Sequence, residues 1–125
     1  FLRIKLRHLG AYNEERRKIA EKLISRIHNP KVTLPQVGEH CEHVWHVFSV
    51  FSQQRDELRA YLEERGIGCN CHYPVPVADQ ECYQEDKLGE TPVSRMLSDT
   101  QLSLPLYIGM TDEEIQYIAD VINQF

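Results

Sequence analysis

One loop of the chain concentrates side chains that could bind a polar ligand. His72-Tyr73-Pro74-Val75-Pro76 follows a glycine-containing run that begins at Gly66. Because proline restricts the backbone, such a loop can hold an imidazole and a phenol at the rim of a pocket. The competing interpretation is a turn in which both side chains satisfy local backbone groups, and composition alone favours it. His72 and Tyr73 are therefore candidate binding residues that need support from elsewhere.

A zinc site is a second possibility, because thiolates and imidazoles are the ligands that zinc prefers. The candidate ligands are Cys41, His43, His46, Cys69, Cys71, His72 and Cys82. Their spacing contains no Cys-x-x-Cys pair, and residues 69 and 71 would point to opposite faces if they lay on one strand. Free thiols and strand histidines are the favoured interpretation, and a zinc-stabilised domain is kept as an alternative.

Two further groups of side chains have structural interpretations. Trp45 and Phe48 could form an aromatic binding surface, but a strand that packs its aromatic residues into the core is more common. The charged residues of the first predicted helix could form a partner surface, although a solvated face with intrahelical ion pairs is the usual outcome. They are Glu14, Glu15, Arg16, Arg17, Glu21 and Lys22. The sequence shows no nucleophile–histidine pattern and no paired carboxylates of the acid–base kind.

The first half of the chain is predicted to place a helix before a strand. Leucine and isoleucine recur at helical spacing over residues 1–27, with a kink expected at Gly10, and Asn29-Pro30 ends the helix. Residues 31–37 contain Pro35 and follow Pro30, and they are predicted to form an edge segment at most. Residues 43–51 are rich in β-branched and aromatic residues and are predicted to form a central strand.

The second half is predicted to add three helices and a short strand. A helix over residues 52–65 ends at Gly66 in a left-handed conformation, and a strand over residues 67–73 follows it. Residues 78–90 are predicted to be a loop, and Thr91-Pro92 opens a helix that runs to about Asp99. Residues 103–106 are expected to be an extended connector. Residues 111–114 form a capping box for the last helix, whose predicted buried face is Ile115, Ile118, Ala119, Ile122 and Phe125.

This order predicts an α+β fold in which a small, mostly antiparallel sheet has helices packed on one face. The 125 residues suit one domain, and 42% hydrophobic with 26% charged residues is typical of a globular chain. A net charge of −5 disfavours a nucleic-acid surface, and no apolar run is long enough for a membrane span. Four irregularly spaced cysteines fit a reducing cytoplasm. The chain opens without methionine, which suggests a piece of a longer protein.

A series of motifs in order resembles the DegT/DnrJ/EryC1/StrS family of sugar aminotransferases. The opening FLRIKL and the run NEERRKIA carry the resemblance first, and HVWHVF and RDEL continue it. GIG, HYPVP, LSLP and GMTDEE complete the series. Any one of these motifs would be weak evidence, but the ordered series covers essentially the whole chain. The resemblance implies that residues 1–125 are the C-terminal small domain of a fold-type I aminotransferase, with the large domain absent.

The resemblance also implies a cofactor, partners and a reaction. Members of this family are pyridoxal-phosphate-dependent homodimers with active sites at the subunit interface, and they transfer an amino group from glutamate to a nucleotide-linked keto sugar. The Schiff-base lysine belongs to the large domain, and the lysines here stand in the wrong context, so the fragment alone is expected to bind no cofactor and to be inactive. They are Lys5, Lys18, Lys22, Lys31 and Lys87.

By the same resemblance, the loop that bears His72 and Tyr73 lies near the substrate end of the active site, and both are expected to contact the sugar or its phosphates. Many relatives have a histidine where this chain has Ala78 and a threonine where it has Cys69, so the sugar cannot be deduced. The alternatives to an aminotransferase fragment are a non-enzymatic interaction or regulatory domain and the zinc-stabilised domain.

Overall fold

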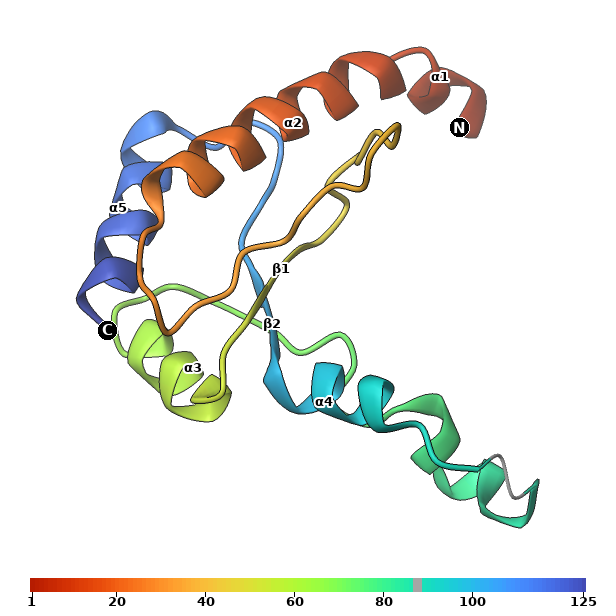
Figure 1. Ribbon diagram of the computed structural model, residues 1–125. Helices are drawn as coiled ribbons and strands as arrows, with labels where there is room; N and C mark the ends of the chain where they lie inside the picture. The colour runs from red at the N-terminus through yellow and green to blue at the C-terminus, as the bar shows by residue number, and fades with distance from the viewer. Residues whose placement is uncertain (87–88) are drawn as a thin grey trace.

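The computed structural model describes residues 1–86 and 89–125, and it begins with two helices (Figure 1). Helix α1 spans Leu2–Leu6 and α2 spans Leu9–Arg26. The predicted single helix is therefore interrupted, but at residues 7–8, and Gly10 lies inside α2. Helix α1 buries no residue, whereas α2 buries Ile19 and Leu23, so core packing stabilises only the second helix.

The sheet consists of two antiparallel strands, β1 (Phe48–Phe51) and β2 (Gln101–Leu104). The predicted strand over residues 43–51 is thus shortened, because the backbone of Trp45 has a φ of 50° and cannot continue an extended strand. Residues 103–106 were expected to be only a connector, yet half of that segment belongs to β2. The prediction of a strand over residues 67–73 is wrong, since only Asn70 forms a bridge, to Ser103.

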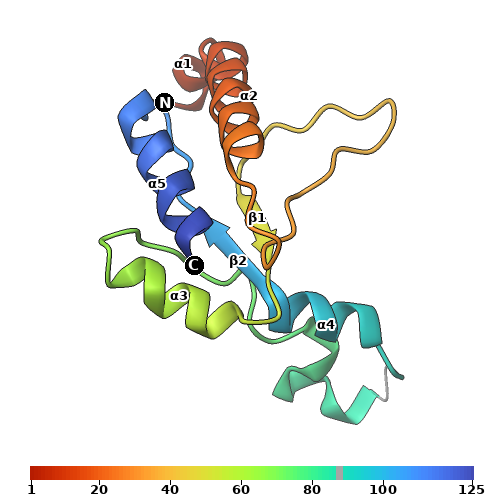
Figure 2. The ribbon, with the colours of Figure 1, turned by 60° about the vertical axis from the view of Figure 1, so that its left-hand side comes forward.

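The two strands have one apolar and one polar face, which follows from the alternation of side chains along a strand. Phe48 pairs with Leu104 and Val50 with Leu102, and these four side chains lie in the core. The other face carries Ser49, Gln101 and Ser103, together with Phe51, which pairs with Gln101 at one end of the sheet. Helices α2, α3 (Arg55–Glu63) and α5 (Asp112–Gln124) lie on one side of the strand pair (Figure 2). The α+β fold with helices on one face of an antiparallel sheet is confirmed.

Two short segments have the local geometry that the sequence predicts. Helix α3 is followed by Gly66 at φ 74°, the left-handed conformation predicted for this glycine. Thr33 forms a bridge with Phe51, so the segment over residues 31–37 touches the sheet edge at one point.

The predicted loop over residues 78–90 contains two short 3₁₀ helices, η1 (Val77–Asp79) and η2 (Glu81–Asp86). Its residues 87–88 lie outside the described residues. Helix α4 spans Pro92–Thr100, with the predicted proline in its first turn, and leads directly into β2. The 3₁₀ segment and α4 extend away from the other helices (Figure 1).

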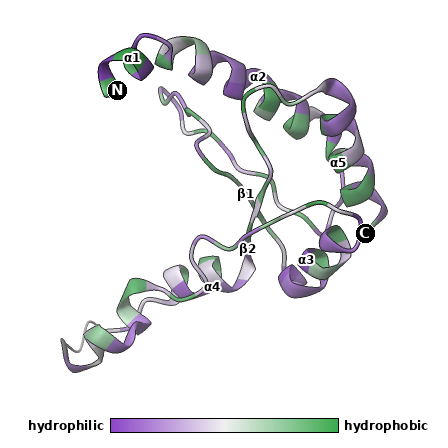
Figure 3. Ribbon diagram, turned by 180° about the vertical axis from the view of Figure 1, so that it is seen from behind, coloured by the Kyte–Doolittle hydropathy of each residue, from purple (hydrophilic) through white to green (hydrophobic). Residues whose placement is uncertain are grey.

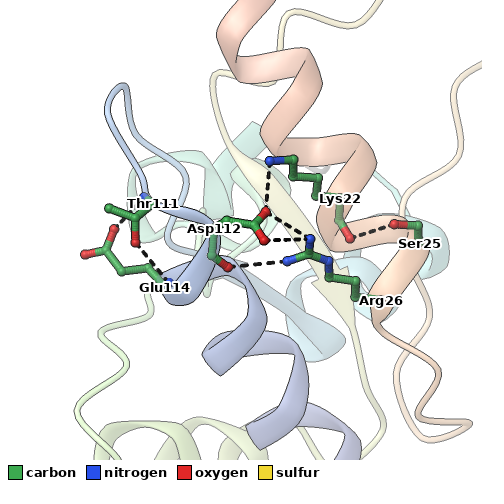
Figure 4. A network of polar contacts seen from close by, with 6 residues as sticks. All are labelled: Lys22, Ser25, Arg26, Thr111, Asp112 and Glu114. Atoms are coloured by element: carbon green, nitrogen blue, oxygen red, sulfur yellow. Dashed lines mark hydrogen bonds and ion pairs between the residues drawn. The ribbon is translucent and has the colours of Figure 1, made fainter.

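Helix α5 has the predicted capping box. The Thr111 hydroxyl accepts a hydrogen bond from the Glu114 backbone N–H at 3.2 Å, and the Glu114 carboxylate accepts one from the Thr111 N–H at 2.8 Å (Figure 4). Of the predicted buried face, Phe125 is only partly buried, and Val121 is buried in addition. Within the described residues, no helix combines the length and hydrophobicity of a membrane span.

Candidate functional site

His72 lies over the polar face of the two-stranded sheet. Its ring Nδ1 is 2.7 Å from the hydroxyl of Ser103, and its backbone N–H donates to Gln101 Oε1 at 2.8 Å. Both partners belong to β2, about thirty positions further along the chain. The ring is therefore anchored by side chains of the sheet, and the competing interpretation of a turn satisfied by local backbone groups is wrong for His72.

Tyr73 lies beside His72 but faces solvent. The two rings meet edge to face with centroids 5.6 Å apart, and Tyr73 is 73% exposed. The structure thus brings the two candidate residues together on one rim. His72 is held by the sheet, whereas the Tyr73 phenol is available to a ligand or to another protein surface.

Buried polar side chains support the ring of His72 from below. Gln101 and Ser103 are each 6% exposed. The Gln101 amide nitrogen donates to Ser103 Oγ at 2.7 Å and to Ser49 Oγ at 2.8 Å. Buried polar groups that are fully hydrogen-bonded are rigid, because breaking any one bond leaves an unsatisfied group. This network therefore fixes the position of the imidazole.

The loop that carries His72 is fixed at both ends by arginines. Before His72, the guanidinium of Arg55 donates to the Cys71 sulfur at 3.0 Å and to the Ser98 carbonyl at 3.3 Å. After it, Arg95 on α4 forms two 2.7 Å hydrogen bonds with Asp79, and this bidentate contact lowers the pKa of the Asp79 carboxyl. The loop between these contacts is thus tied to both α3 and α4.

An open groove of about 380 Å³ lies next to the His72 ring. Its polar side chains come from three segments of the chain, and apolar side chains supply the larger part of its wall: Val47, Phe48, Leu104, Pro105 and Leu106. The polar lining consists of His46, Cys69, Asn70, His72 and Ser103. A groove with several nitrogen donors and few charges suits a polar ligand with acceptor oxygens.

The proposed zinc ligands are dispersed. Cys41 and Cys82 are exposed, Cys71 is buried, and Cys69 is half-buried. Burial, with a smaller contribution from the charge of Glu63, raises the pKa of the Cys69 thiol to about 11, which disfavours a thiolate. In the part of the chain that the structure describes, no three histidine, cysteine or acidic side chains gather closely enough to bind a metal. The structure gives the zinc alternative no support.

The other candidates mostly have structural roles. Trp45 and Phe48 are buried with ring centroids 5.5 Å apart, so their interpretation as core residues is confirmed. The expectation for the charged face of α2 was incomplete. Glu14 pairs with Arg17 within the helix, but the same arginine also contacts Glu42 at 3.1 Å. Lys22 reaches Asp112 on α5 at 2.9 Å (Figure 4). This face joins α2 to neighbouring segments.

Sequence reasoning missed the surroundings of His72: its partners Gln101 and Ser103, Ser49 behind Gln101, and Asn70 beside the ring. The alternation Gln101-Leu102-Ser103-Leu104 was the available signal, because period two indicates a strand with one polar face. Nothing comparable marks Asn70, whose position depends on its bridge to Ser103, with backbone hydrogen bonds of 3.2 and 2.7 Å.

This fold matches solved aminotransferase structures. DesV from S. venezuelae, whose crystal structure contains a ketimine intermediate, superposes with a TM-score of 0.93. The two chains are 32% identical over 98% of this chain and 34% of DesV. The architecture is therefore that of part of an aminotransferase.

The model of the DegT/DnrJ/EryC1/StrS aminotransferase family matches residues 1–123, and the chain belongs to this family. A dTDP-3-amino-3,6-dideoxy-alpha-D-galactopyranose transaminase from Aneurinibacillus thermoaerophilus is 35% identical over 99% of the chain. A pleiotropic regulatory protein from Geobacillus stearothermophilus is 31% identical, also over 99% of the chain. The chain spans about a third of the length of both relatives: 34% and 35%, respectively.

Proposed function

We propose that this chain is the small domain of a pyridoxal-phosphate-dependent aminotransferase that moves an amino group from glutamate to a nucleotide-linked keto sugar. The observation that carries the proposal is the family match over residues 1–123, together with the coverage of only a third of each relative. The remaining length corresponds to a large domain that binds the cofactor. The active enzyme is a homodimer in this proposal, and it works in the cytoplasm without nucleic-acid or membrane partners.

The role of this domain is to supply contacts at the substrate side of the active site. His72 and Tyr73 are the proposed contacts to the sugar or its phosphates. Two features support this: the His72 ring borders the groove while the sheet anchors it, and the exposed Tyr73 ring packs edge to face against His72. Both groups act by binding and orienting the substrate and not by moving its protons.

The residues of this chain do not fit pyridoxal phosphate by themselves. The cofactor requires a lysine amine at its reactive carbon, and no lysine lines the groove beside His72 in the described part of the chain. Lys22 is engaged by Asp112 at 2.9 Å, and Lys31 donates to the Phe125 carbonyl at 2.7 Å. Lys87 lies outside the described residues. We therefore assign the cofactor lysine to the large domain and expect the 125-residue chain alone to be inactive.

The exposed apolar side chains of α1 suit contact with another part of the enzyme. Phe1, which precedes α1, and Leu2, Ile4 and Leu6 within it are between 63% and 90% exposed. Figure 3 shows hydrophobic and hydrophilic residues alternating along this short helix. Exposed apolar groups that gather in this way mark interaction surfaces. This supports a contact between α1 and either the large domain or the second subunit.

A regulatory or interaction role is the second candidate, and the name of the Geobacillus relative favours it. Enzyme assays separate the two. The longer protein, supplied with pyridoxal phosphate, glutamate and dTDP- or UDP-linked keto sugars, should release 2-oxoglutarate and an aminated sugar nucleotide. His72→Ala should lower kcat/KM for the sugar nucleotide at least tenfold and leave the half-reaction with glutamate unchanged. Absence of turnover with every such sugar would reject the enzymatic proposal.

A further inference from the structure

The orientation of the Gln101 amide follows from its partners. The backbone N–H of His72 can only donate, so the Gln101 atom at 2.8 Å from it is the carbonyl oxygen Oε1. The amide nitrogen must then face the two serine hydroxyls, at 2.8 Å from Ser49 and 2.7 Å from Ser103. Gln101 therefore gives one hydrogen to each serine.

The hydroxyl of Ser103 in turn determines which nitrogen of His72 carries hydrogen. Ser103 Oγ already accepts a hydrogen bond from Gln101, and it lies 2.7 Å from Nδ1 of His72. If Nδ1 carried the hydrogen, the buried hydroxyl would receive two donors and its own hydrogen would find no acceptor among the described side-chain contacts. If Nδ1 carries no hydrogen, Ser103 donates to it, and both the buried hydroxyl and Nδ1 are satisfied. The ring hydrogen then lies on Nε2.

The Nε2–H group has a second donor beside it. Asn70 uses its side-chain oxygen to accept the Cys71 N–H at 2.9 Å, so its amide nitrogen is the atom that lies 3.5 Å from His72 Nε2. Two N–H donors at this separation do not bond to each other, and both are exposed on the wall of the groove. An acceptor oxygen placed between them could bind both donors at once.

We propose that His72 Nε2–H and the Asn70 amide form a two-donor site for an anionic oxygen, and that Gln101 and Ser103 are positioning residues that hold His72 in this tautomer. The matching ligand chemistry is a phosphate or a carboxylate, because each offers oxygen acceptors and no competing donor. Assigning this oxygen to the sugar nucleotide rests on the proposed function. The tautomer and the binding of the oxygen do not, and both are measurable on the 125-residue chain.

Nitrogen-15 NMR of the histidine rings tests the positioning role. In the wild-type chain at a pH where the ring is neutral, hydrogen should be on Nε2 of His72, with Nδ1 in a hydrogen bond; His72→Gln identifies the signal. Gln101→Glu replaces the donor to Ser103 with an acceptor. The Ser103 hydroxyl should then donate its hydrogen to the carboxylate, and the ring hydrogen of His72 should move to Nδ1. The matched control is Ser49→Ala, which removes the other partner of Gln101 and should leave the ring unchanged.

Two results would overturn this assignment. One is a hydrogen on Nδ1 of His72 in the wild type, and the other is an Nδ1 without hydrogen in the folded Gln101→Glu variant. If that variant does not fold, Ser103→Ala decides instead. Removing the hydroxyl should move the Nδ1 signal to the position of a nitrogen without a hydrogen bond, and an unmoved signal contradicts the proposal.

Titration with inorganic phosphate and with acetate tests the two-donor site. The His72 Nε2 and Asn70 Nδ2 signals should shift together with one saturable midpoint, and Asn70→Asp should weaken the response at least tenfold. A tighter midpoint for phosphate assigns the site to a phosphate group, and a tighter midpoint for acetate assigns it to a carboxylate. Absence of a saturable response, or an equal response in Asn70→Asp, rejects the site. A positive titration with an enzymatically inactive longer protein would reject the proposed function alone.

Discussion

Cys69 illustrates how the environment of one side chain sets its chemistry. It lines the groove near His72, and its half-buried thiol donates to the Ile67 carbonyl at 3.6 Å. Burial raises its pKa from an ordinary value of 9.0 to about 11, and the charge of Glu63 acts in the same direction. Below both values the thiolate fraction is then about 100-fold lower than that of an ordinary cysteine.

We therefore expect Cys69 to resist alkylation at neutral pH. Iodoacetamide followed by peptide mass spectrometry should modify the exposed Cys82 well before Cys69, and the Cys69 rate should keep rising with pH to about 11. Cys41, also exposed, is the second internal reference. Equal rates for all three thiols at pH 7 would contradict the burial of Cys69.

At the residue scale, the sequence singled out His72 as a candidate binding residue but did not predict the side chains around it. The prolines after Tyr73 marked the loop, and His72 was its one imidazole. Asn70, Gln101 and Ser103 carry common side chains whose role appears only when β2 lies under the loop. Contacts between positions about thirty residues apart depend on strand register, which the local pattern does not encode for so short a sheet.

Two threonines at helix starts show that one motif can have two outcomes. Thr111 caps α5 through its hydroxyl, with Glu114 completing the box. Thr91 precedes α4, but its hydroxyl makes no capping bond, and it is buried without a hydrogen-bond partner among the described residues. The sequence predicted both starts correctly, yet only the structure distinguishes the cap that contributes to stability.

The two threonines therefore form a matched pair for mutagenesis. Thr111→Ala should reduce the free energy of unfolding by about 1 kcal/mol, because the N–H of Glu114 loses its acceptor. Thr91→Ala removes no hydrogen bond and takes away a buried hydroxyl without a partner among the described residues, so it should not reduce stability. Urea denaturation followed by circular dichroism measures both, and equal losses would show that capping geometry is not the cause.

The ion pairs between α2 and α5 make the stability of the fold depend on pH in the acid range. Asp112 at the start of α5 accepts hydrogen bonds from Lys22 at 2.9 Å and from Arg26 at 2.9 and 3.1 Å (Figure 4). These bonds, that of Lys22 first, lower the pKa of Asp112 below its ordinary value of 3.8. The unfolded chain therefore binds the proton more readily, so the stabilisation is complete well above pH 3.8 and is lost as the pH falls through the lowered folded-state pKa.

Asp112→Asn should accordingly reduce stability at pH 7 and flatten its decline below pH 4. Denaturant midpoints measured at several pH values test this. Asp120→Asn is the control on the same helix. Among the described residues Asp120 accepts only an intrahelical bond from Gln116, so the decline of this variant should match the wild type. An unchanged acid profile in Asp112→Asn would show that the ion pairs do not stabilise the fold.

Strands were harder to predict than helices for a physical reason. Helices α3 and α5 were found from local apolar spacing and from Gly66 and Thr111 at their boundaries. The segment over residues 43–47 has the composition of a strand, yet it bends at Trp45, whose carbonyl accepts a hydrogen bond from Arg16 on α2. Tertiary contacts therefore determined the backbone conformation of residues 43–47. They also determined that half of the predicted connector over residues 103–106 belongs to β2.

At the scale of the whole molecule, the fold is a scaffold with a core on one side and a polar loop on the other. The apolar sheet face packs against α2, α3 and α5, while the opposite face supports His72 (Figure 2). The series of motifs predicted the family correctly, although individual elements were predicted only in part, because the series extends across nearly the whole chain.

The central claim is that this domain supplies substrate contacts while a lysine of the large domain holds the cofactor. The most direct measurement is borohydride reduction of the longer protein with pyridoxal phosphate, followed by peptide mapping, with the 125-residue chain treated in parallel. We predict one labelled lysine outside this sequence and no saturable labelling of the chain alone. Stoichiometric labelling of a lysine within residues 1–125 would contradict the account.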